Sequence, residues 1–152
     1  RTTRNREKKA DDGILKSQRI LLTWMIDDAN ALQQIRRVIR SDDFTEPLYR
    51  TVAELLYQQM DEGLVNPAQI MNHFSDEEEH RKVAELFHTK IRELTTREEQ
   101  EKALNETVRR VKQNSLDEMA RRLEPTDIAG LQKLMEDKRA LQDAKGLHIS
   151  II

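Results

Sequence analysis

The sequence contains no cysteine, which excludes a disulfide framework, a cysteine-ligated zinc site and a thiol nucleophile. With only four glycines and three prolines, it has too few turn-forming residues for an all-β protein of many short strands. Aromatic residues make up 4% of the chain. Any core therefore has to be built mainly from aliphatic side chains.

Long apolar runs are also missing. The most apolar window, residues 20–26, includes a threonine and is far shorter than the roughly 20 residues that span a bilayer. The charged residues at the start lead into no apolar segment of a signal peptide. Because the sequence does not begin with Met, we expect an excised part of a longer protein. The missing cysteines, membrane span and signal peptide lead us to expect a soluble, intracellular chain.

The residues that are present favour one helical protein of mixed surface charge. Leu, Ile, Val and Phe together account for 37 of the 152 residues, about 24%, which is above the roughly 20% below which disorder is expected. The 26 basic and 28 acidic residues nearly cancel, giving a net charge of −2. Such a surface is not that of a polycation built to hold nucleic acid.

Apolar residues recur at helical spacing from Ile14 onward and predict six helices before residue 114. Helix starts are indicated by Thr45 and Asn66, each shortly before a proline, and by the capping boxes that begin at Ser75 and Thr96. Gly63 is expected to end a helix. The side chains assigned to the core include Trp24, Leu56 and Phe87. The fold class expected is all-α.

Three regions are predicted along the chain. Residues 1–13 carry charges without apolar periodicity and are expected to be a flexible linker, and residues 14–114 are expected to form a six-helix bundle subdomain. A long helix then joins this bundle to an antiparallel helical hairpin with an apolar tail, residues 115–152. Within the long helix the apolar stripe rotates by about 90° near Asn114, so the helix either passes to a second surface or breaks there.

The hairpin has more apolar residues than its two helices can cover. Leaving such side chains in water forgoes about 1.5–3 kcal/mol each. The hairpin therefore either folds back on the bundle or offers its face to another protein. The rotated stripe favours a projecting, partner-binding hairpin.

Catalytic and metal-binding patterns are not found. Glu77 with His80 and Glu85 with His88 have the carboxylate–imidazole spacing of di-iron bundles, but both pairs lie on one predicted helix, whereas the site needs two facing helices. The glycines form no phosphate-binding loop. Basic pairs such as Arg109-Arg110 are interleaved with acids and are interpreted as solvated helix faces. No catalytic residue, cofactor or metal site is predicted.

Several phrases resemble the C-terminal helicase-binding domain of bacterial replicative DNA primases, the DnaG family, in its Gram-positive, clostridial form. The resemblance covers roughly residues 14–150 and depends on the order of these phrases: RILLTW at 19–24, DFTEPLY at 43–49, VKQNS at 111–115, LQKL at 131–134 and LHIS at 147–150.

The resemblance implies a non-catalytic domain that docks on the N-terminal domains of the hexameric replicative helicase and stimulates it. It also implies a bacterial, cytoplasmic protein that acts at the replication fork and is monomeric when isolated. The parent primase would make RNA primers, with zinc and magnesium held by domains that this sequence lacks. No membrane contact and no direct nucleic-acid binding are expected.

The helicase-binding residues are predicted on the hairpin and its tail. The apolar anchors are Leu131, Leu134, Met135, Leu141, Leu147 and Ile149, and the polar rim is Lys138, Arg139, Lys145 and His148. Some of these must pack inside the hairpin, and the sequence does not sort them. Replacing Leu134 or Leu141 with Asp is expected to abolish binding while leaving the helicity of the bundle intact.

Two other functions remain open. The bundle part of the primase-domain family is itself similar to the N-terminal domain of the replicative helicase, so that helicase domain is the first alternative, although a helicase would continue through a linker to an ATPase. A helical nucleic-acid-binding module is the second alternative, and it predicts a basic patch without acids.

Overall fold

A computed structural model gives the arrangement of the chain. It describes the backbone of residues 2–88, 96–143 and 147–151, and the side chains from residue 13 onward within those ranges except at residue 88. The described residues form seven α-helices and one short 3₁₀ helix, with no β-strand among them. The prediction of an all-α fold is confirmed.

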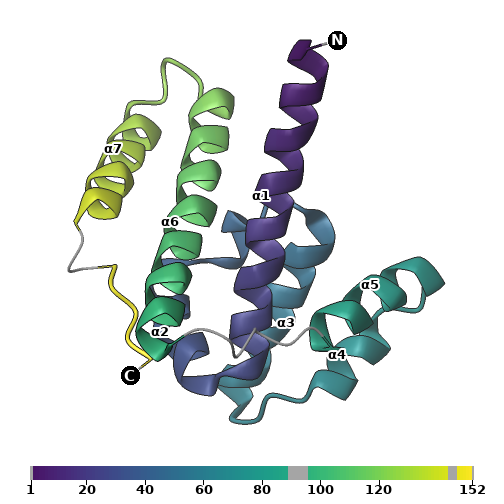
Figure 1. Ribbon diagram of the computed structural model, residues 1–152. Coiled ribbons are helices and arrows are strands. Elements are labelled where there is room, and N and C mark those ends of the chain that lie inside the picture. Colours follow the sequence, from purple (N-terminus) through teal and green to yellow (C-terminus); the bar gives the residue numbers. More distant parts are fainter. Residues whose placement is uncertain (1, 89–95, 144–146, 152) are drawn as a thin grey trace.

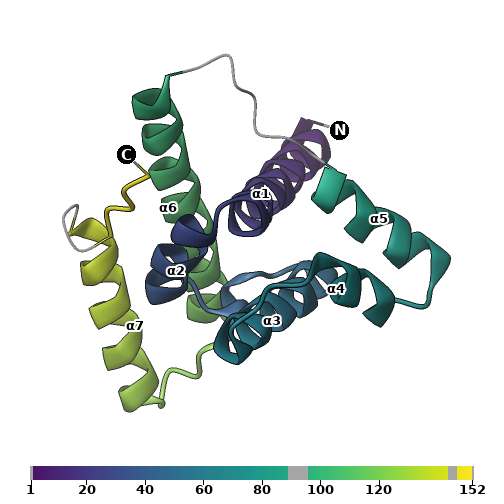
Figure 2. The same cartoon turned by 90° about the horizontal axis from the view of Figure 1, so that it is seen from below.

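The helices α2, α3, α5 and α6 pack against α1, and α7 lies on the side of α6 away from α5 (Figures 1 and 2). Their bounds are α1 Thr2–Asp27, α2 Ala29–Val38, η1 Ser41–Asp43, α3 Pro47–Glu62, α4 Pro67–His73, α5 Glu77–His88, α6 Arg97–Arg122 and α7 Ile128–Gln142.

Local sequence signals explain several of these bounds. Asn66 accepts hydrogen bonds from the first backbone N–H groups of α4, and Thr96 does the same for α6. Gly63 adopts the left-handed conformation, with φ of 93°, at the end of α3. These three predictions are confirmed.

Two predicted caps are wrong in detail. Asp76, not Ser75, accepts the hydrogen bond from the Glu79 N–H at the start of α5. The Thr45 hydroxyl does not cap α3 but accepts a hydrogen bond of 2.7 Å from the Gln18 side chain of α1. A tertiary partner has therefore replaced the local one.

The first helix is longer than the sequence indicates. The expected linker over residues 1–13 is helical from Thr2 and continues without interruption into the rest of α1. Lys, Arg, Glu and Ala are good helix formers, so the segment continues a helix although it lacks an apolar stripe.

The main core is formed by side chains from the helices α1 to α6. Its fully buried side chains include Leu21, Ile35 and Leu104, and Trp24 and Leu56 belong to it as predicted. Phe87 packs at its margin and is partly buried. Ile149 and Ile151, which lie close to the C-terminus, are also part of this core.

The long helix is continuous through Asn114, which settles the alternative left open by the rotated stripe. Before that point Leu104, Val108 and Val111 face the main core. After it, Leu116 belongs to a separate apolar cluster with Leu134 and Leu141 of α7. A single straight helix thus serves two apolar clusters on different sides.

Candidate protein-binding surface on the α6–α7 hairpin

The turn between α6 and α7 is fixed by local contacts. The Asp127 carboxylate accepts a hydrogen bond of 2.9 Å from the Gly130 N–H at the start of α7. A Cβ atom at Gly130 would lie 2.6 Å from that carboxylate and 2.8 Å from Leu123 Cδ1, both too close for ordinary contact. A side chain at position 130 would therefore displace the ends of the Asp127 and Leu123 side chains and disturb the cap of α7.

The second apolar cluster holds α7 against the far half of α6. Leu134 and Leu141, 5% and 7% exposed, pack with the fully buried Leu116, and Leu123 and Leu147 pack at the margin. Arg109 of α6 also donates a hydrogen bond to the backbone carbonyl of Leu141. A small apolar cluster between α6 and α7 is therefore separate from the main core, and α7 lies beside α6 in Figure 1.

The tail returns from α7 along α6 and is held by two side-chain amides. Asn105 of α6 bonds both the N–H and the C=O of Ile149, at 2.7 and 2.9 Å. Gln34 of α2 does the same for Ser150, at 2.8 and 2.6 Å. An amide has both a donor and an acceptor, so each one pairs with an extended residue as a neighbouring strand would. We call residues 147–151, held in this way, the clamped tail.

The structure separates the predicted site residues by their exposure. The exposed ones are Leu131, Met135, Arg139 and His148, and Lys138 is half-buried. The buried ones are Leu134, Leu141 and Ile149, and Leu147 is partly buried. Lys145 lies outside the described residues. His148 also bonds Glu101 at 3.0 Å. Only the four exposed residues and Lys138 can contact a partner without a rearrangement of the chain.

Replacing Leu134 with Asp is expected to release α7 instead of simply blocking a partner. A buried carboxylate would have no cation or donor in the Leu116 cluster, and desolvating it is costly. Limited proteolysis of the variant should show early cleavage within residues 128–142, whereas exposed Met135→Asp should match the parent protein. Equal resistance of Leu134→Asp would contradict the observed packing.

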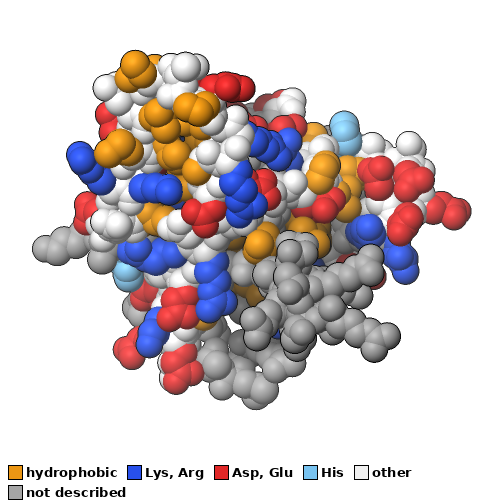
Figure 3. All heavy atoms as spheres, turned by 90° about the horizontal axis from the view of Figure 1, so that it is seen from above, with side chains coloured by type: hydrophobic (Ala, Val, Ile, Leu, Met, Phe, Trp, Pro, Cys, Tyr) orange, Lys and Arg blue, Asp and Glu red, His pale blue; other side chains and the backbone are white. Residues whose placement is uncertain are grey.

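Exposed apolar side chains remain on α7. Ile128, Leu131 and Met135 are 68%, 38% and 56% exposed and follow one another at helical spacing. Met119, in the last turn of α6 before the chain reverses, is 39% exposed. Figure 3 shows hydrophobic side chains gathered over this end of the hairpin. We call Ile128, Leu131 and Met135 the α7 stripe. Exposed apolar patches of this kind mark protein-interaction sites.

Sequence reasoning placed Leu131 and Met135 in the site and left out Ile128 and Met119. Ile128 has a signal, because it shares the apolar spacing of α7 and directly follows the Asp127 cap. Met119 has none, since its neighbours on α6 include buried residues at the same spacing.

Other chemistry receives no support from the described part of the chain. It holds no group of three or more His, Asp or Glu residues that could bind a metal ion. None of its helices is long and apolar enough to cross a membrane. In the basic pair Arg36-Arg37, the first arginine forms an ion pair. Arg36 donates hydrogen bonds to both carboxylate oxygens of Asp61, at 2.5 and 2.8 Å, and these bonds lower the pKa of that carboxyl.

Comparisons with known protein families, with curated proteins and with solved structures give no match for this chain.

Proposed function

We propose that this chain is the helicase-interaction domain of a bacterial replicative primase, a non-catalytic module that docks on the replicative helicase and stimulates it. In this proposal residues 14–114 are the bundle subdomain, and residues 115–152 are the hairpin subdomain that binds the helicase N-terminal domains. The module needs no cofactor, and primer synthesis belongs to the parent protein at the replication fork.

The α7 stripe carries the proposal. Ile128, Leu131 and Met135 are large apolar side chains that remain 38–68% exposed, on a helix that already packs against α6 through Leu134 and Leu141. A rigid helix that presents i, i+3 and i+7 anchors is a common way to recognise a protein partner. The sequence resemblance supplies the identity of that partner.

Titration calorimetry against the replicative helicase hexamer tests the proposal. We expect Leu131→Asp and Met135→Asp each to weaken binding by about 30-fold or more, because an interface anchor contributes about 2 kcal/mol or more. Leu64→Asp is the matched control, since Leu64 is 74% exposed and lies on the loop between α3 and α4.

The outcome separates the alternatives. Binding that is lost in both α7 variants and kept in the Leu64 control supports docking through the hairpin. An absence of binding by the folded parent protein to a cognate helicase would overturn the proposal. Truncation after residue 114 is not a suitable control, because it also removes Ile149 and Ile151 from the main core.

A further inference from the structure

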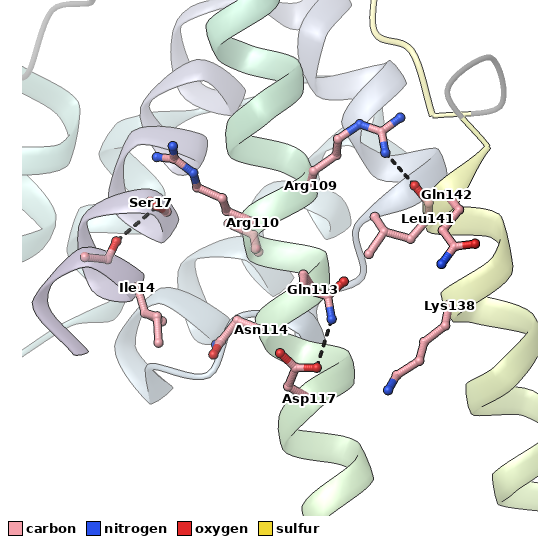
Figure 4. A pocket seen from close by; sticks show the side chains of 12 residues that line it. Ile14, Ser17, Arg109, Arg110, Gln113, Asn114, Asp117, Lys138, Leu141 and Gln142 are labelled. Carbon is pink, nitrogen blue, oxygen red and sulfur yellow. Dashed lines mark hydrogen bonds between the residues drawn. The ribbon is translucent and has the colours of Figure 1, made fainter. Parts of the chain in front are cut away.

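A groove of about 830 Å³ runs along α6 between α1 and α7 (Figure 4). Gly13, Ile14 and Ser17 line it on the α1 side, and Lys138, Leu141 and Gln142 line it on the α7 side. The lining residues between these two walls belong to α6. Three helices therefore form a shallow trough with an open fourth side.

The size of the trough suits a helix. An α-helix with its side chains is about 10 Å across and rises 5.4 Å per turn, so two turns occupy about 850 Å³. The α7 wall also continues beyond the groove. Leu131, Met135, Lys138 and Gln142 are spaced i, i+4, i+7 and i+11 and so lie along one side of α7. An occupant could contact both apolar stripe residues and the groove.

The charges in the groove are unbalanced. Arg110 of α6 and Lys138 of α7 line it, and no carboxylate among the described residues pairs with either. The one acid in the lining, Asp117, accepts a hydrogen bond of 2.8 Å from Gln113 and keeps its charge. The three cations Arg109, Arg110 and Lys138 therefore exceed the acids of the lining by two. Arg109 is occupied by the Leu141 carbonyl. An occupant that brings carboxylates would complement the two remaining cations.

We propose that the groove between α1 and α7 binds an acidic amphipathic helix of the partner protein. Its apolar side chains would pack on Ile14, Leu131 and Met135, and its carboxylates would lie near Arg110 and Lys138. The inference rests on the proposed function for the identity of the partner, here the helicase, and adds the chemistry of the segment that is bound. The bound helix completes a four-helix arrangement.

The test uses a fluorescently labelled 14-residue peptide as the probe, designed as a helix with Leu at one face and Glu along its edge. Anisotropy at low salt should show saturable binding to the full chain. Arg110→Glu and Lys138→Glu should each weaken it about tenfold, and Arg37→Glu, an exposed arginine on α2, should change it less than twofold. The same peptide with Lys in place of Glu should bind at least tenfold more weakly than the Glu peptide.

The same variants titrated with the helicase distinguish the two proposals. Helicase binding that is weakened by Leu131→Asp but unchanged by Arg110→Glu and Lys138→Glu, with no peptide binding, would overturn the groove inference and keep the proposed function. Charge-dependent peptide binding without helicase binding would support the groove and overturn the proposed partner. Equal binding of the Glu and Lys peptides would also overturn the inference.

Discussion

Replacing Asp43 with Ala is expected to lower the free energy of unfolding by about 3–5 kcal/mol. Asp43, in η1, is 4% exposed and accepts hydrogen bonds from the Ser115 hydroxyl at 2.7 Å, the Lys112 ammonium at 3.0 Å and the Arg40 N–H at 2.8 Å. Removing one partner of a buried ion pair leaves the other charge uncompensated, which is the costly case. Lys112 would be that charge.

Urea unfolding followed by circular dichroism measures this effect, and the chain offers two controls. Asp42 is an exposed neighbour in the same short helix, so Asp42→Ala should change stability by less than about 0.5 kcal/mol. Ser115→Ala removes one neutral donor and should cost about 1–2 kcal/mol. If Asp43→Ala lowered the free energy of unfolding no more than Asp42→Ala does, the contacts between η1 and α6 would not contribute to stability.

Truncating Ile149 to Ala should also be severe, with a loss of about 2–5 kcal/mol. Ile149 is 1% exposed and belongs to the main core although it lies beyond the hairpin in sequence. Removing its side chain forfeits apolar burial and leaves a cavity between helices that are fixed by many other contacts. The backbone hydrogen bonds to Asn105 would still hold the tail, so the cavity could not collapse easily.

Thermal and urea unfolding test this second expectation against Leu64→Ala, which removes an exposed leucine and should be nearly neutral. Asn105→Ala removes the side-chain amide that bonds the backbone of Ile149, so it tests the same tail without changing a residue of the core. A loss below about 1 kcal/mol for Ile149→Ala would mean that the tail contributes little to folding.

The helices and their order could be predicted because local physics determines them. The caps at Asn66 and Thr96 and the left-handed Gly63 all act within a few residues of the backbone groups they satisfy. The Asp43 cluster could not be predicted, since Asp43 and Ser115 are 72 residues apart and nothing in either segment marks the other. A pair of this kind becomes visible only once η1 and α6 are packed.

The candidate site was predicted at the level of the element but not of the side chain. Periodicity identifies α7 as amphipathic, yet Leu131 and Leu134 are one turn apart and differ by only about 60° around the helix. The first is 38% exposed and the second 5%. The position of the Leu116 cluster on α6 decides which one is covered. The clamped tail was missed because Asn105 and Gln34 contact backbone, which has no sequence signature.

The clamped tail also determines how the hairpin can move. The α7 helix is attached at one end through the turn to α6 and at the other through Ile149, whose clamp on Asn105 spans 44 residues of chain. The clamp therefore anchors the end of the chain on α6, the same helix from which the turn to α7 starts. Extracting Ile149 from the core costs about 1.5–3 kcal/mol of apolar burial, so any movement of α7 that pulls the clamped tail out of the core has to overcome that cost.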